Sequence, residues 1–198
     1  LNICILEAES DVAMGATKAN SGIVHAGYDA EEGSLKARLN VAGSKMMKLV
    51  TDELGVKYKN NGSLVVGFSD EDREHIEKLV CRGIANGVEG VRLVEAEELY
   101  ALEPNISREA TCALYAPTGG IVCPYELCIA SIGNAMDNGA SLICDFRVEK
   151  IEALDGEYVI SSDTESIGAR YVVNCAGLHS DKIARLVGDD SFTVSSRR

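Results

Sequence analysis

The chain has 198 residues, of which 19 are Lys or Arg and 31 are Asp or Glu, so its formal net charge is −12. Hydrophobic residues make up 46% and charged residues 25%, which is typical of a globular domain and too apolar for a disordered chain. The excess of acid argues against nucleic acid and anionic membrane surfaces as partners. No apolar run approaches the roughly 18 residues that cross a bilayer, so no transmembrane segment is expected.

The chain begins at Leu1, directly in an apolar run, and a secretory signal with its charged leader is not expected there. We expect the sequence to be a piece of a longer protein. Its seven cysteines form no C-x-x-C pair, which argues against a zinc or iron–sulfur site. Free thiols in this number favour a reducing compartment, and we expect the cytoplasm.

In the first half of the chain, a buried strand is predicted over residues 3–7, followed by a loop of small residues over 11–33. Ser34 is a suitable N-cap for a helix that ends near Gly55. That helix carries an apolar stripe at helical spacing, formed by Leu35, Leu39, Ala42, Met46, Leu49 and Val50. Further elements are a strand over 63–68, a helix from Asp70 to Asn86–Gly87, and a short helix over 96–102.

In the second half, a strand is predicted over 111–115 and a helix from Pro124 to Asn138. Three short strands follow, over 147–154, 158–162 and 169–175, the first two separated by the turn Asp155–Gly156. A last short helix is predicted with Ser180 as N-cap and with Ile183, Leu186 and Val187 facing inward. These elements predict an α/β core, of mixed helices and strands, with an antiparallel addition.

Three segments could bind a ligand, and each also has an ordinary structural interpretation. Glu7 closes a strand, where a dinucleotide fold places the acid that binds ribose hydroxyls, although an acid there can simply be solvated. The loop over residues 15–27 is rich in small residues that allow close approach of a ligand, or is an ordinary surface loop. The strand-to-helix turn around Ala176 and Gly177 offers free amides, or is small for packing reasons alone.

Taken together, the three segments resemble the D-amino-acid oxidase superfamily of FAD-dependent oxidoreductases. The matching motifs are A-T-x-x-N-S-G at residues 16–22, I-V-H-A-G at 23–27, G-G-I-V at 119–122 and V-V-N-C-A-G at 172–177. Within the superfamily they are similar to L-2-hydroxyglutarate oxidases and dehydrogenases and to FAD-dependent glycerol-3-phosphate dehydrogenases. The G-x-G-x-x-G turn that normally lies roughly 20 residues before the strand-end acid is not within these residues.

The resemblance implies part of a Rossmann-like FAD-binding domain with a β-meander, together with part of an antiparallel substrate domain. Residues 1–55 and 118–198 are expected to belong to the FAD-binding domain, and residues 56–117 to the substrate domain. It also implies cofactor contacts from the ribose to the flavin ring by Glu7, Thr17, Asn20, Ser21, Gly22, Val148, Ala176 and Gly177. His25 is implied near the flavin, as the base that takes the proton from a substrate hydroxyl, or is a packed side chain without that role.

The implied activity is oxidation of a secondary alcohol on a small anionic substrate, such as glycerol 3-phosphate or an L-2-hydroxy acid, by hydride transfer to flavin. Lys36 and Arg38 are the cations nearest in sequence to the loop, although they also suit the exposed first turn of a helix. An amine or amino-acid oxidase and a non-catalytic scaffold domain stay open as alternatives. The electron acceptor is not predicted, and the 198 residues alone are expected to be inactive.

Overall fold

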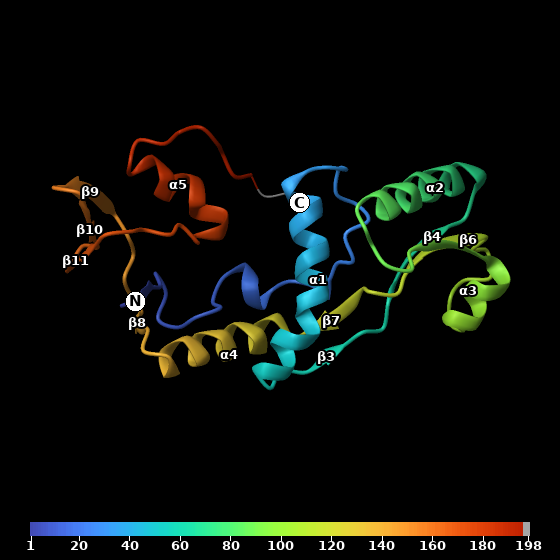
Figure 1. Cartoon of the computed structure of the whole chain (residues 1–198), viewed down its shortest axis with the longest axis horizontal. Coiled ribbons are helices and arrows are strands. Elements are labelled where there is room, and N and C mark those ends of the chain that lie inside the picture. The colour runs from blue at the N-terminus through green and yellow to red at the C-terminus, as the bar shows by residue number, and fades with distance from the viewer. Residues whose placement is uncertain (196–198) are drawn as a thin grey trace. The chain divides into compact units, whose positions relative to one another are not determined.

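The computed structural model describes residues 1–195. The chain divides into two compact units (Figure 1), one over Gly15–Asn134 and one that joins Leu1–Met14 to the residues from Ala135 onward. Each unit has its own hydrophobic core, so each is described by itself.

The larger unit contains an antiparallel sheet in the order β4 (Ser63–Gly67), β6 (Cys112–Ala116) and β5 (Arg92–Glu95). Helix α2 (Asp70–Ala85) packs on one face and α3 (Ala96–Leu102) on the other. Alternation along β6 builds both cores, because Cys112 and Leu114 join the α2 side while Ala113 joins the α3 side. All three of these side chains are completely buried.

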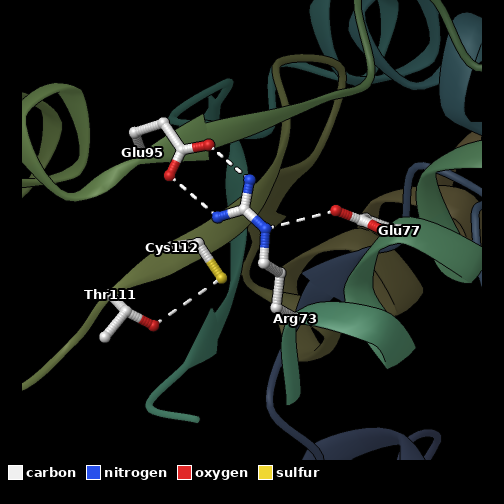
Figure 2. Close-up of polar contacts among 5 residues, drawn as sticks. All are labelled: Arg73, Glu77, Glu95, Thr111 and Cys112. Carbon is white, nitrogen blue, oxygen red and sulfur yellow. Dashed lines mark hydrogen bonds and ion pairs between the residues drawn. The ribbon is translucent and has the colours of Figure 1, made fainter. Parts of the chain in front are cut away.

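Polar contacts attach α2 to the edge of this sheet (Figure 2). The guanidinium of Arg73 on α2 donates to both carboxylate oxygens of Glu95 on β5, at 2.9 and 2.5 Å, and its Nε donates to Glu77 at 3.2 Å. The hydrogen bond from Arg73 and its positive charge lower the pKa of Glu95. Beside this pair, the hydroxyl of Thr111 lies 3.9 Å from the buried sulfur of Cys112.

A second antiparallel sheet in the larger unit has the order β2 (Ile23–Val24), β7 (Gly120–Val122) and β3 (Tyr58–Lys59). A 3-10 turn, η1 (Ala16–Lys18), precedes β2, and helix α1 (Leu35–Glu53) follows it. Ser34 caps α1 as predicted, since its hydroxyl accepts from the backbone N–H of Ala37 at 3.1 Å. Helix α4 (Pro124–Asp137) begins at Pro124, also as predicted.

The buried face of helix α1 is not the face that carries its large apolar side chains. Its fully buried residues are Ala37 and Thr51. The predicted apolar stripe is largely exposed, with relative exposures of 57–60% at Leu35, Leu39, Met46 and Leu49. The large apolar side chains therefore contribute little to the core of this unit.

The smaller unit pairs β1 (Cys4–Leu6) in parallel with β8 (Ser141–Ile143), next to an antiparallel sheet of β9 (Lys150–Leu154), β10 (Glu157–Ser161) and β11 (Ser166–Ala169). Its core is formed by Phe146, Ile151 and Ile160. A 3-10 turn, η2 (Gly177–His179), leads into helix α5 (Ser180–Arg185), whose Ile183 packs on that core, as does Leu186 just after it. The parallel pair, the antiparallel sheets and the helices confirm the predicted mixed α/β class.

Several local predictions are wrong. The third strand of the antiparallel sheet is β11, which ends at Ala169, whereas residues 171–175 form no strand and Tyr171 and Val173 are exposed. The N-cap of α5 is His179 rather than Ser180, and Val187 is exposed. The strand over 3–7 is shorter than predicted, and Cys4 is exposed. Short strands β2, β3, β5, β7 and β8 were not predicted, because two to four residues carry too little periodicity.

Within residues 1–195, no helix has both the length and the apolar character needed to span a bilayer.

Candidate functional site

In the larger unit, the segment around β2 presents one row of side chains to an open surface. Ser21, Ile23 and His25 are exposed, whereas the intervening Gly22, Val24 and Ala26 are buried. This alternation is that of an extended strand with one covered face. Ile121 of β7 is the register partner of Ile23 and is also exposed, so two apolar side chains lie side by side on the face that carries His25.

Gly22 fixes this row to the sheet through its backbone. Its φ is +65°, and its carbonyl accepts from the N–H of Val122 at 2.9 Å. A Cβ at this position would lie 2.3 Å from the backbone oxygen of Val122 and 3.3 Å from Cδ of Pro124. Only glycine fits, for both steric and conformational reasons.

Asn20 holds the loop before β2 together. Its Nδ2 donates to the carbonyls of Ala16 and Thr17 at 3.2 and 2.8 Å, and its Oδ1 accepts from the N–H of Gly22 at 2.9 Å. Both donor hydrogens of this amide are therefore used within the loop. Thr17 and Ser21 are exposed on the same loop, so their hydroxyls face solvent.

The main chain of His25 is held by α1. Asn40 of α1 donates from Nδ2 to the carbonyl of His25 at 2.8 Å, while the imidazole itself is on an exposed residue. The loop that follows is held by Asn86, whose Nδ2 donates to the carbonyls of Gly27 and Ala30 at 3.0 and 2.8 Å. The position of His25 is thus determined by main-chain contacts that leave its ring available to a ligand.

In the smaller unit, Glu7 follows the parallel strand β1. Its backbone N–H donates to Ile143 and its carbonyl accepts from Phe146, both at 2.9 Å. One carboxylate oxygen, Oε1, accepts from the N–H of Glu9 at 2.9 Å, and among residues 1–195 the other accepts no hydrogen bond. Burial, together with the carboxylates of Asp11, Glu7 and Asp145, raises the pKa of the nearby Cys144 thiol.

The remaining predicted residues of this unit are Val148, Ala176 and Gly177. Val148 is half-buried just before β9 and packs on the core, two residues after the Phe146 that is bonded to Glu7. Ala176 and Gly177 are exposed, and the N–H of Ala176 donates to Oδ1 of Asn174 at 3.2 Å. Gly177 has φ of +53°, and a Cβ placed on it would meet no heavy atom within 4 Å, so open space lies beside it.

The predicted residues divide between the two units. Thr17, Asn20, Ser21, Gly22 and His25 lie on one continuous segment of the larger unit. In the smaller unit, Glu7 is hydrogen-bonded to Phe146, two residues before Val148, whereas among residues 1–195 no hydrogen bond or ion pair joins Ala176 or Gly177 to either of them.

Ile121 and Asn174 belong to the motifs at residues 119–122 and 172–177 that carry the resemblance, although neither was predicted as a site residue. Asn40 was missed, because it acts through a contact with His25 at a sequence separation of 15 that leaves no pattern in the chain.

Each unit taken by itself has groups that fit part of a dinucleotide. In the smaller unit, the carboxylate beyond a parallel strand can accept from ribose hydroxyls. In the larger unit, small exposed residues allow close approach to the backbone, and the two exposed isoleucines can contact an apolar ring. No group of three or more metal-ligating side chains is found in residues 1–195.

The model of the family described as DAO, FAD dependent oxidoreductase, matches residues 1–198. A glycerol 3-phosphate dehydrogenase of Caloramator mitchellensis is 42% identical over the whole chain, and the mitochondrial L-2-hydroxyglutarate dehydrogenase of Homo sapiens is 34% identical over 95% of it. The chain spans 41% and 43% of the length of these two relatives.

Solved structures agree on the fold. The dithionite-reduced L-alpha-glycerophosphate oxidase of Mycoplasma pneumoniae, with FAD bound, is 27% identical and superposes with a TM-score of 0.86 over 92% of this chain and 50% of that one. Glycine oxidase of Geobacillus kaustophilus has the same TM-score over 94% of this chain and 52% of that one, at 21% identity, and shows the shared fold alone.

Proposed function

Because this chain belongs to the FAD dependent oxidoreductase family, we propose that the complete protein oxidises a secondary alcohol on a small anionic substrate. The substrate is glycerol 3-phosphate or an L-2-hydroxy acid such as L-2-hydroxyglutarate. The observation that carries this proposal is that relatives at 42% and 34% identity are named for these two substrates, each a hydroxyl compound bearing anionic groups. The chain spans less than half of each relative, so the activity is that of the whole protein.

The open row of the larger unit supports a role for His25 in this reaction. Bound FAD supplies a hydride acceptor, and the alcohol must lose its hydroxyl proton as the hydride leaves its carbon. An exposed imidazole on the same face as two apolar side chains is suited to take that proton, since neutral histidine is a base near neutral pH. Asn40 positions the main chain of His25 without engaging the ring.

The other predicted residues receive binding roles in the proposal. Glu7 accepts from the ribose hydroxyls through its carboxylate, and Val148 meets the adenine through its backbone. Thr17 and Ser21 offer hydroxyls along the path between pyrophosphate and flavin, while Asn20 and Gly22 keep that path in shape. Ala176 and Gly177 provide an unobstructed backbone at the far end of the cofactor.

The proposal extends to domain roles and compartment. Residues 1–55 and 118–198 belong to the FAD-binding domain and residues 56–117 to the substrate domain, a division that stays a prediction.

The substrate is small and anionic, and nucleic acid is not a partner. Seven free cysteines support a reducing compartment, which we propose is the cytoplasm.

An anaerobic absorption spectrum of the complete protein tests the proposal. We expect a flavin band that is bleached by glycerol 3-phosphate or by L-2-hydroxyglutarate when each is added separately, because reduction removes the oxidised flavin absorption. Glycine serves as the control substrate for an amine oxidase. Bleaching by glycine alone would contradict alcohol oxidation, and absence of any flavin band after addition of FAD would favour a scaffold domain.

A further inference from the structure

The C-terminal end of helix α2 holds the loop after β2 by its main-chain carbonyls. Asn86, the C-cap residue of α2, donates from Nδ2 to the carbonyls of Gly27 and Ala30 at 3.0 and 2.8 Å. One turn earlier, Arg82 donates from Nη1 to the carbonyl of Asp29 at 3.0 Å. Three of four consecutive carbonyls in this loop therefore accept from two side chains at one helix end.

The amide of Asn86 has a single usable orientation. Both hydrogens on Nδ2 are taken by the loop, and an exchanged amide would set Oδ1 against two carbonyl oxygens. Oδ1 is itself buried and accepts no hydrogen bond from residues 1–195. The side chain therefore serves the loop carbonyls and leaves its own acceptor without a donor in this part of the chain.

Only one residue separates His25 from the first of these carbonyls, and that residue is tightly packed. Ala26 is 1% exposed and lies in the core on the α2 side of the sheet. Gly27 is buried as well, with a φ of +108°. Asn40 of α1 and Asn86 of α2 thus hold the main chain on the two sides of Ala26. Because a packed interior does not absorb such movements, a displacement of Gly27 is transmitted to His25.

We propose that Asn86 is a positioning residue for the reaction. Through the loop carbonyls, it keeps His25 where the imidazole can take the proton of the substrate hydroxyl, and the inference rests on that proposed function of His25. Arg82 adds to the same hold from an exposed side chain, so its contribution is smaller. An element of the expected substrate domain thereby positions a residue of the expected FAD-binding domain.

Stopped-flow reduction of the flavin in the complete protein tests this role, with whichever of glycerol 3-phosphate and L-2-hydroxyglutarate bleaches it. Asn86→Asp has nearly the size of asparagine but sets a carboxylate oxygen against the two loop carbonyls, so the loop must move. We expect reduction at saturating substrate to be at least about tenfold slower, since a misplacement of roughly 1 Å can reduce a rate by about 100-fold. FAD binding should change little.

A double-mutant cycle with His25→Asn separates positioning from general damage. In the His25→Asn background, Asn86→Asp should slow reduction by less than about twofold, because the base that Asn86 positions is already absent. Tyr100→Phe is the matched control, since the hydroxyl of Tyr100 also donates to loop carbonyls, at 2.8 Å, on the α3 side of the sheet. This control should lower the melting temperature and leave the rate of reduction unchanged.

Arg82→Gln is a milder second variant that keeps the proposal testable if Asn86→Asp does not fold. It removes one hydrogen bond to the carbonyl of Asp29 from an exposed side chain. We expect reduction to be slower by about twofold or more, and this effect too should be absent in the His25→Asn background.

Several results would overturn the proposal. Reduction at the wild-type rate in Asn86→Asp, or equal slowing by Asn86→Asp with and without His25, would show that Asn86 does not act through the base. Loss of FAD together with the rate would indicate damage to cofactor binding instead. Failure of the proposed function is seen separately, in proteins that keep Asn86: neither substrate bleaches the flavin, or His25→Asn retains the wild-type rate. The positioning role would then fail with it.

Discussion

Among single residues, Gly22 and Asn20 hold the loop before β2 in shape, in addition to any contact with a ligand. The carbonyl of Gly22 joins the loop to β7, and the side chain of Asn20 closes the turn that begins at Ala16. Their presence in the family motif therefore has a structural basis that is independent of FAD. A substitution at either position is therefore expected to change the shape of the loop, and any effect on cofactor contact would follow from that change.

Gly22→Ala is expected to destabilise the larger unit by about 2 to 4 kcal/mol, because it combines a positive φ with a clash on the Val122 carbonyl. Gly33→Ala is the matched control, since Gly33 also has a positive φ of +74° but no atom within 4 Å of the place a Cβ would take. The control should cost about 1 to 2 kcal/mol. Urea denaturation followed by circular dichroism measures both, and equal losses would show that the Val122 contact does not matter.

His25→Asn is expected to slow flavin reduction in the complete protein by at least about 100-fold, because the variant lacks a base for the substrate hydroxyl. FAD binding should change little, since the loop is held through the carbonyl of His25 rather than its ring. Stopped-flow bleaching and an FAD titration measure the two effects. Equal loss of flavin reduction and of FAD binding in His25→Asn would remove the proposed role of His25 as the base.

Glu7→Ala should show the opposite pattern, with weaker FAD binding and an almost unchanged rate of flavin reduction in the occupied enzyme.

Among the elements, α2 has the most complete local signal for its beginning. The hydroxyl of Ser69 accepts from the N–H of Asp72 at 3.1 Å, and the carboxylate of Asp72 accepts from the N–H groups of Phe68 and Ser69 at 2.9 and 3.1 Å. This reciprocal arrangement is a capping box with Asp in the place of Glu. The bonds from Phe68 and Ser69 lower the pKa of Asp72.

Ser69→Ala is expected to lower the free energy of unfolding by about 1 kcal/mol, because it removes the side-chain acceptor for one of the free N–H groups of the first turn. Ser69→Thr keeps a hydroxyl in the same place and should recover most of the loss. Thermal unfolding followed by circular dichroism compares the two variants. If Ser69→Thr is as unstable as Ser69→Ala, the hydroxyl is not the stabilising group.

Over the whole molecule, acid should destabilise the fold. The pKa values of six carboxyl groups are lower in the folded chain than their ordinary values of 3.8 for Asp and 4.5 for Glu: Asp72, Glu89, Glu95, Glu98, Asp181 and Asp189. A group with a lowered folded pKa stabilises the fold fully above its unfolded pKa and loses that contribution as the pH falls through its folded pKa. Stability should therefore be nearly constant between about pH 6 and 8 and should decrease below about pH 4.5.

Melting temperatures between pH 3 and 8 measure this dependence. Glu95→Gln removes one carboxylate of the Arg73 contact and should reduce the slope below about pH 4.5. Because the carboxylates of the ion pairs at Glu89, Glu95 and Glu98 are exposed, added salt should also reduce the slope. A stability that rises on acidification would contradict the shared direction of these shifts.

The sequence by itself determined the elements whose signals are local. Ser34 and Pro124 mark helix starts, and Asp155–Gly156 forms a turn in which both residues have positive φ, so the helices and the β9–β10 hairpin could be predicted. The motifs at residues 16–27 and 172–177 likewise indicate the family without any knowledge of the fold. These signals are carried by residues close together in the chain.

Only the tertiary structure decided which apolar side chains are buried and which residues they pack against. The runs at Tyr171–Val173 and Leu35–Leu49 have the composition of buried segments, yet in these 198 residues they are largely exposed. The register of β2 against β7 aligned Ile23 with Ile121, a contact between residues 98 positions apart. Burial and long-range pairing depend on what lies opposite in space, and no local pattern specifies that.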